Sequence, residues 1–95
     1  MKRYIRASEL KFVDVSDYQE LSSTLRDGRD TYALYRKLEN GKGRWAAAKY
    51  TEKGYPDKDH AFEITYAQAL GNEPLSESGV RELSKYLGKI LLPRR

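Results

Sequence analysis

The chain contains no cysteine and a single histidine, His60. The lack of cysteine excludes disulfide bonds, thiolate zinc sites and cysteine nucleophiles, so a metal site would have to be built mainly from carboxylates. Long hydrophobic runs are also missing, since no stretch approaches the roughly 18 apolar residues of a membrane-spanning helix. The start, MKRYIRASEL, lacks the uninterrupted apolar segment of a secretion signal. We therefore expect a cytosolic protein that does not associate with membranes.

Recognisable catalytic motifs are absent as well. The sequence has no phosphate-binding loop before a predicted helix, no dinucleotide fingerprint and no base evident for a serine nucleophile. Asp57, Asp59, His60 and Glu63 lie close together in the sequence and could hold a divalent cation or form an acid–base group. Aspartates in a loop rich in proline and glycine more often stay solvated and cap turns. We therefore predict a non-enzymatic protein with no cofactor and no evident small-molecule substrate.

The length and charge of the chain set its general class. We expect the 95 residues to form one compact domain, with residues 93–95 as a flexible basic tail. Charged residues make up 34% of the chain and the net charge is +4. Lysine and arginine gather in residues 36–53 and 81–95, whereas residues 59–77 contain neither. This separation favours a surface with two signs of charge, which could steer a polyanion toward one side.

The most informative segment spans residues 31–51 and predicts a β-hairpin. Asn40 and Gly41 both tolerate the positive φ of a type I′ turn, although Gly43 leaves the loop length open. An even-length loop places alternate side chains on opposite faces, whereas a three-residue loop would change which residues share a face. One face of the even-length hairpin carries Tyr32, Leu34, Arg36, Leu38, Trp45, Ala47 and Lys49, and the other carries Ala33, Tyr35, Lys37, Arg44, Ala46, Ala48 and Tyr50.

Two segments before the hairpin predict further elements. Residues 2–15 contain two short alternating pieces, at 4–7 and 10–15, and we expect at least one of them to be a strand. Ser16 and Gln19 have the spacing of a capping box, which predicts a helix beginning there. Tyr18, Leu21 and Leu25 then recur at helical spacing, and Gly28 follows as a stop.

Two more elements follow the hairpin. Residues 61–70 alternate apolar and polar side chains and predict a strand through Tyr66, although the final YAQAL would also suit a helix. The last element is predicted as a helix closed by Pro93, because its apolar residues fall on one side. These residues are Val80, Leu83, Leu87, Ile90 and Leu91.

Taken together, the elements predict an α+β fold in the order β-α-β-β-β-α. We expect an antiparallel sheet of three or four strands with both helices packed on one face. The helices would cover Leu34, Leu38, Trp45, Phe62 and Ile64, which leaves the opposite face of the hairpin open to a ligand.

The interleaving of tyrosine with lysine and arginine predicts the function of that open face. Aromatic rings that stack on bases beside cations that meet phosphates are typical of single-strand binders, and a hairpin can also read duplex DNA from the major groove. Tyrosine and arginine equally dominate protein interfaces, so the alternatives are a protein partner or self-association through the edge of the strand at 61–70. The predicted binding residues for nucleic acid (DNA or RNA) or a protein partner are Tyr35, Lys37, Lys42, Arg44, Tyr50, Lys85 and Lys89.

Three partial resemblances point the same way. The predicted order of helix, three strands and helix over residues 16–91 is similar in outline to a double-stranded-RNA-binding domain, although the last helix lacks that family's lysine-rich start. The hairpin with its tryptophan resembles the arm-binding domains of phage-type integrases. The opening KRYIRAS is similar to small proteins of bacterial mobile elements. These resemblances imply a nucleic-acid partner, or an inhibitor or adaptor encoded by a phage or mobile element.

Overall fold

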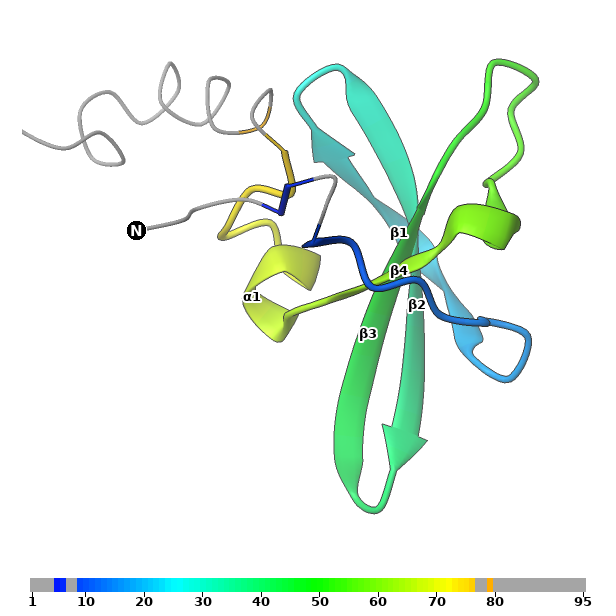
Figure 1. Ribbon diagram of the computed structural model, residues 1–95, viewed down its shortest axis with the longest axis vertical. Coiled ribbons are helices and arrows are strands. Elements are labelled where there is room, and N and C mark those ends of the chain that lie inside the picture. The colour runs from blue at the N-terminus through cyan, green and yellow to red at the C-terminus, as the bar shows by residue number, and fades with distance from the viewer. Residues whose placement is uncertain (1–4, 7–8, 77–78, 80–95) are drawn as a thin grey trace, which may run out of the picture.

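The computed structural model describes residues 5–6, 9–76 and 79, and its main feature is an antiparallel sheet of four strands (Figure 1). The strands follow the chain in the order β1-β2-β3-β4, so each pairs with its neighbour in sequence. A short 3-10 turn, η2, precedes β4, and a single helical turn, α1, follows it. The bounds are β1 Gln19–Asp27, β2 Asp30–Glu39, β3 Lys42–Lys49, η2 Lys58–His60, β4 Phe62–Ile64 and α1 Tyr66–Ala69. No helix in these described ranges is long and apolar enough to cross a membrane.

The hairpin of β2 and β3 forms as predicted and projects from the rest of the sheet (Figure 1). Asn40 and Gly41 have φ values of 53° and 79°, the left-handed conformation that a type I′ turn requires. Glu39 pairs directly with Lys42, so the loop has two residues. The even-length loop is therefore confirmed, and with it the assignment of side chains to the two faces of the hairpin.

The helix predicted to begin at Ser16 is wrong, because residues 19–27 form strand β1 and pair with β2. Leu21 and Leu25 are four residues apart, and that spacing places two side chains on one face of either a helix or a strand. Tyr18, in the turn just before β1, packs on the cluster of the opposite face, whereas a single helix would place it on the same side as Leu21 and Leu25. The run Ser22-Ser23-Thr24 is also poor in helix formers and contains the β-bulge of this edge strand.

The strand predicted from residue 61 through Tyr66 forms, but it is shorter than predicted, since it spans only Phe62–Ile64. β4 ends at Ile64, and Thr65 then caps α1: its hydroxyl accepts from the Gln68 amide at 3.0 Å and its own amide donates to the Gln68 side chain at 2.8 Å. These reciprocal bonds satisfy the first turn of a helix, which is why the chain leaves the strand. The tail YAQAL takes the helical alternative.

Two other predicted elements do not appear as strands or helices of the described chain. Within residues 5–6 and 9–15 no strand forms, and Phe12 makes only an isolated bridge to Phe62. The helix predicted after residue 79 lies outside the described residues. The structure therefore shows an open antiparallel sheet with one short helix and one 3-10 turn, and it supports the α+β class only loosely.

The sheet has apolar clusters on both faces, which corrects the prediction of one covered and one open face. The first cluster is centred on Phe62 and the second on Tyr35. The segment that enters β1 supplies Val15 and Tyr18 to the second cluster. The buried members of the first are Leu25, Tyr32, Leu34, Ala47, Phe62, Ile64 and Leu75, and those of the second are Val15, Ala33, Tyr35, Ala46, Ala48 and Ala61.

Candidate functional site

The two tyrosines predicted to stack on a ligand belong largely to the core. Tyr35 is only 2% exposed, and Tyr50 is half-buried against the same cluster. Burial raises the pKa of Tyr35 to about 12, because the phenolate would lose its hydration. Val15 covers this face, and it belongs to a segment that is distant from β2 in the sequence. Tyr35 therefore stabilises the fold and is not available to stack on a base.

The hydroxyl of Tyr35 is buried without a hydrogen-bond partner among the described residues. We expect Tyr35→Phe to leave the free energy of unfolding unchanged or to raise it by up to about 1 kcal/mol, because it removes an unsatisfied polar group. Urea denaturation measures this change, and Tyr55→Phe, at a tyrosine that is 70% exposed, is the matched control. A loss of more than about 1 kcal/mol would show that the hydroxyl has a partner.

Lys37 is held by carboxylates. Its ammonium donates to Asp17 at 2.8 Å and lies 3.9 Å from Glu39, above the ring of Tyr18. The hydrogen bond raises the pKa of Lys37 and lowers the pKa of Asp17. The cation that was predicted to meet a phosphate is therefore engaged within the protein.

Arg44 is held more firmly than Lys37. Its Nη1 donates to Glu39 at 2.8 Å, while Nη2 and Nε donate to one oxygen of Glu63 at 2.8 and 3.2 Å. Hydrogen bonds from the guanidinium lower the pKa of both glutamates, and the two carboxylates raise the pKa of Arg44. A phosphate would have to displace two charged partners to reach this side chain.

Lys42 is the one remaining predicted site residue that the structure describes. Lys42 is exposed at the start of β3, directly after the hairpin turn, and has no ion pair with another described residue. Lys85 and Lys89 lie outside the described residues. The face predicted to bind a ligand thus combines a buried tyrosine with cations that are already paired.

The candidate metal or acid–base residues at 57–63 take part in two separate sets of interactions. Asp57 pairs with Nδ1 of His60 at 2.9 Å, while Glu63 binds Arg44 and lies 3.5 Å from Lys11. Within the described ranges, no group of three or more histidine, aspartate or glutamate side chains is placed to hold a metal ion.

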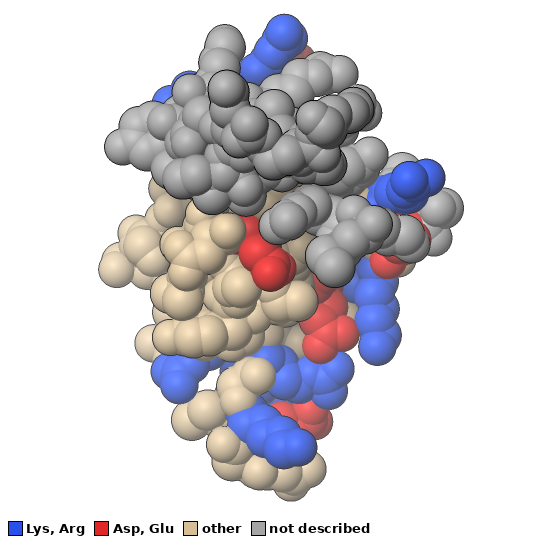
Figure 2. Space-filling model, turned by 90° about the vertical axis from the view of Figure 1, so that its left-hand side faces the viewer, with Lys and Arg blue, Asp and Glu red and all other residues tan. Residues whose placement is uncertain are grey.

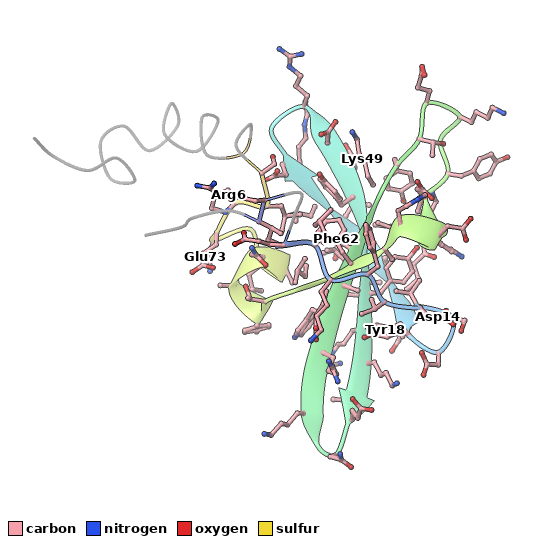
Figure 3. The ribbon with its side chains drawn as sticks, viewed as in Figure 1. Arg6, Asp14, Tyr18, Lys49, Phe62 and Glu73 are labelled. Atoms are coloured by element: carbon pink, nitrogen blue, oxygen red, sulfur yellow. The ribbon has the colours of Figure 1, made fainter. Side chains whose placement is uncertain are left out.

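A groove of about 470 Å³ is bordered by Ile5, Leu10 and Phe12 on one side and by the sheet around Phe62 on the other. Phe62 lies on the edge strand β4, near the middle of the molecule in this view, and Lys49 lies toward the end of β3 away from the hairpin turn (Figure 3). The polar groups along the groove bind each other or nearby residues: Asp57 pairs with His60, and Lys49 lies 3.5 Å from Asp30. The groove therefore offers apolar walls but few unused polar groups to orient a small molecule. Its lining comprises Ile5, Leu10, Phe12, Tyr32, Lys49, Asp57, His60, Phe62, Leu75 and Ser76.

A different surface carries unpaired binding groups, and we call it the aromatic–arginine surface. It consists of Arg36 and Leu38 on β2, Trp45 on β3 and Tyr66 on α1. Leu38 is 64% exposed and Tyr66 is 57% exposed, although both are large apolar side chains. Seen from the side on which α1 lies, uncharged surface and acidic side chains share the middle of the molecule, with lysine and arginine nearer the hairpin turn (Figure 2).

Contacts within the aromatic–arginine surface hold its rings in place. Arg36 pairs directly with Trp45 across β2 and β3, and its guanidinium carbon lies 5.4 Å from the centre of the indole. Tyr66 packs on Trp45 with the ring centres 5.2 Å apart. The capping of α1 by Thr65 places Tyr66 there, two residues after β4 ends. The surface is thus a preformed group of two packed rings, tilted by 40° to each other, and one cation.

The sequence did not reveal this surface because Leu38 and Trp45 were expected beneath two helices. In the structure Leu38 is exposed, so its predicted place in the covered core is wrong. The signal that could have found the surface is the position of Leu38 next to the two-residue turn, since the end of a projecting hairpin is rarely covered.

The edges of the sheet differ in their accessibility. At the outer side of β4, Val13 donates to the Ala61 carbonyl at 3.0 Å, and Glu63 donates to the Lys11 carbonyl at 2.9 Å. A second copy of the chain would have to displace residues 11–13 to pair at this edge. β1 forms the opposite edge, and its bulge interrupts the ladder there. Self-association through an edge stays a prediction.

Comparisons with known proteins identify no family: no protein-family model, no curated protein and no solved structure matches this chain.

Proposed function

We propose that this protein is a non-enzymatic binding module that docks a partner protein on the aromatic–arginine surface. The observation that carries the proposal is the exposure of Leu38 and Tyr66 around a fixed Trp45. Tryptophan, tyrosine and arginine are the residues that contribute most to binding at protein interfaces. Exposed apolar side chains gathered on one surface also lose unfavourable hydration when a partner covers them.

The proposal is tested by recovering the partner from an extract of the native cell after nuclease treatment. We expect Tyr66→Ala to weaken retention of the partner about tenfold or more, because it removes one ring of the packed pair. Tyr55→Ala is the matched control, since Tyr55 is 70% exposed and lies in the loop after β3. Leu38→Asp serves as a second variant, because an exposed side chain at this position can change without disturbing the core.

Two results would contradict the proposal. One is retention of the same partner by both Tyr66→Ala and Leu38→Asp at the level of the unaltered protein. The other is loss of all bound material on nuclease treatment, which would favour nucleic acid.

Nucleic-acid binding is the second candidate, and the charge distribution favours it. The described residues carry slightly more acidic than basic side chains, so the positive net charge comes from the rest of the chain, including Lys85 and Lys89. A gel shift of the full chain with single-stranded and double-stranded probes at low salt tests this candidate. Affinity that falls steeply with salt would support it, and absence of any shift would exclude it.

A further inference from the structure

Within the described part of the chain, Arg36 is the only basic side chain that is half-buried and has no hydrogen bond or ion pair. The basic side chains with a carboxylate partner within 4 Å are Lys11, Lys37, Arg44, Lys49 and Lys58. The other unpaired ones are exposed to solvent, namely Arg6, Arg26, Arg29, Lys42 and Lys53. Arg36 has therefore lost part of its hydration without gaining a charged partner.

The inner nitrogen of the guanidinium shows this loss most clearly. Nε of Arg36 is buried and has no acceptor among the described residues, while the terminal Nη groups are not sealed from solvent. A partner reaches the terminal Nη groups, and a guanidinium that has already lost part of its hydration gains more from a carboxylate there than a fully hydrated arginine does. The indole of Trp45 also orients the guanidinium, which reduces the entropy that binding would remove.

The sheet itself has no acid on this face near Arg36. The register places Gln19 and Trp45 beside Arg36, with Leu38 next along the same face of β2. The nearby acidic residues of the sheet, Glu20, Glu39 and Glu63, occupy register positions of the opposite face. A carboxylate that pairs with Arg36 must therefore come from outside this part of the fold.

We infer that the aromatic–arginine surface recognises an acidic segment of the partner, in which a glutamate or aspartate carboxylate binds Arg36 beside apolar side chains that pack on Leu38 and Tyr66. This inference rests on the proposed function and specifies the chemistry of the partner. The planar guanidinium matches a carboxylate with two parallel N–H donors, and charge-assisted bonds of this kind are about twice as strong as neutral ones. The exposed rings and the leucine provide the adjoining apolar contact.

The test uses a short acetylated and amidated peptide of alternating leucine and glutamate, with a matched peptide in which glutamine replaces glutamate. Trp45 is the only tryptophan of the chain, so its fluorescence and its indole N–H signal in NMR spectra report binding at the surface. We expect the glutamate peptide to bind at least about tenfold more tightly than the glutamine peptide. We expect Arg36→Gln to abolish this preference, while Arg29→Gln, at an exposed unpaired arginine, keeps it.

The possible contrary outcomes are distinguishable. Equal binding of both peptides, lost in Leu38→Asp, would overturn the role of Arg36 and leave the proposed function standing. Binding of neither peptide at millimolar concentration would overturn the acidic-segment inference, while the extract experiment decides the proposed function separately. Tighter binding of a short oligothymidylate that also requires Arg36 would overturn it in favour of a phosphate ligand.

Discussion

Phe62→Ala is expected to lower the free energy of unfolding by about 3–5 kcal/mol. Phe62 is 8% exposed and lies at the centre of the first apolar cluster, where it pairs with Ala47 across the sheet and meets the ring of Tyr32 edge-on at 6.0 Å. Truncation removes the contact with Tyr32 and leaves a cavity beneath β4. This strand is short, and few other buried side chains hold it to the sheet. Since small domains are stable by only about 5–15 kcal/mol, the variant should be close to unfolding at moderate temperature.

Phe12→Ala is the matched control for this prediction. Phe12 makes an isolated bridge to Phe62, yet its side chain is 56% exposed. We expect it to cost less than about 1 kcal/mol, because little apolar area returns to water. Urea denaturation of both variants, with the slope checked for constancy, gives the comparison. Similar losses at the two positions would contradict the assignment of Phe62 to the core.

Asp27→Ala is expected to lower the free energy of unfolding by about 2–4 kcal/mol, because it leaves two donors without their acceptor. The carboxylate of Asp27 is 5% exposed at the end of β1. It accepts from the Leu75 amide at 2.9 Å and from the Ser76 hydroxyl at 2.5 Å, and so joins β1 to a segment far along the chain. A side chain on Gly79 would collide with this carboxylate, which shows how closely the segment packs.

Asp14→Ala provides the control for Asp27, since the Asp14 carboxylate accepts from the Ser16 amide at 3.0 Å but is exposed. We expect it to cost less than about 1 kcal/mol. Hydrogen exchange of the Leu75 amide adds a local readout, and it should accelerate in Asp27→Ala and not in Asp14→Ala. The prediction fails if the two variants have equal stability and Leu75 exchanges at the same rate in both.

The hairpin was predictable because its signal is local. Asn40 and Gly41 adopt a conformation that few other residue pairs tolerate, and the two-residue loop then decides the pairing of Arg36 with Trp45. The capping box at Thr65 is equally local, and it decides where β4 stops. Both features involve residues within a few positions of one another in the chain.

β1 was not predictable from the same kind of signal. Leu21 and Leu25 satisfy both the helical and the strand pattern, and the capping-box spacing at Ser16 and Gln19 is not used. The Ser16 amide instead bonds the Asp14 side chain in a turn. β1 forms because its backbone supplies the hydrogen-bond partners that one side of β2 needs. The sequence of residues 19–27 alone does not show this need.

The candidate site divides in the same way. The sequence predicted that Tyr35, Lys37 and Arg44 share one face, which the register confirms, and it predicted a hairpin rich in tyrosine and basic residues. It did not predict that Val15 and Tyr18 would cover that face, or that carboxylates from Asp17 and Glu63 would pair with its cations. Leu38 and Arg36 lie on the other face of the hairpin, and only the tertiary structure shows that Leu38 is exposed and that Arg36 is unpaired.

The sequence by itself determined the hairpin and its turn at Asn40-Gly41, whereas the structure settled the two-residue loop and with it the register of β2 with β3 and the two sets of side chains. The tertiary structure alone decided which parts of each face are buried, which cations find a carboxylate and which are left without one. The physical reason is that backbone conformation and alternation depend on near neighbours, whereas burial and ion pairing depend on segments brought together from distant positions. In this protein those segments are residues 13–18, which lead into β1 and pack on the second apolar cluster, and the short strand β4 with the capped helix α1 that follows it.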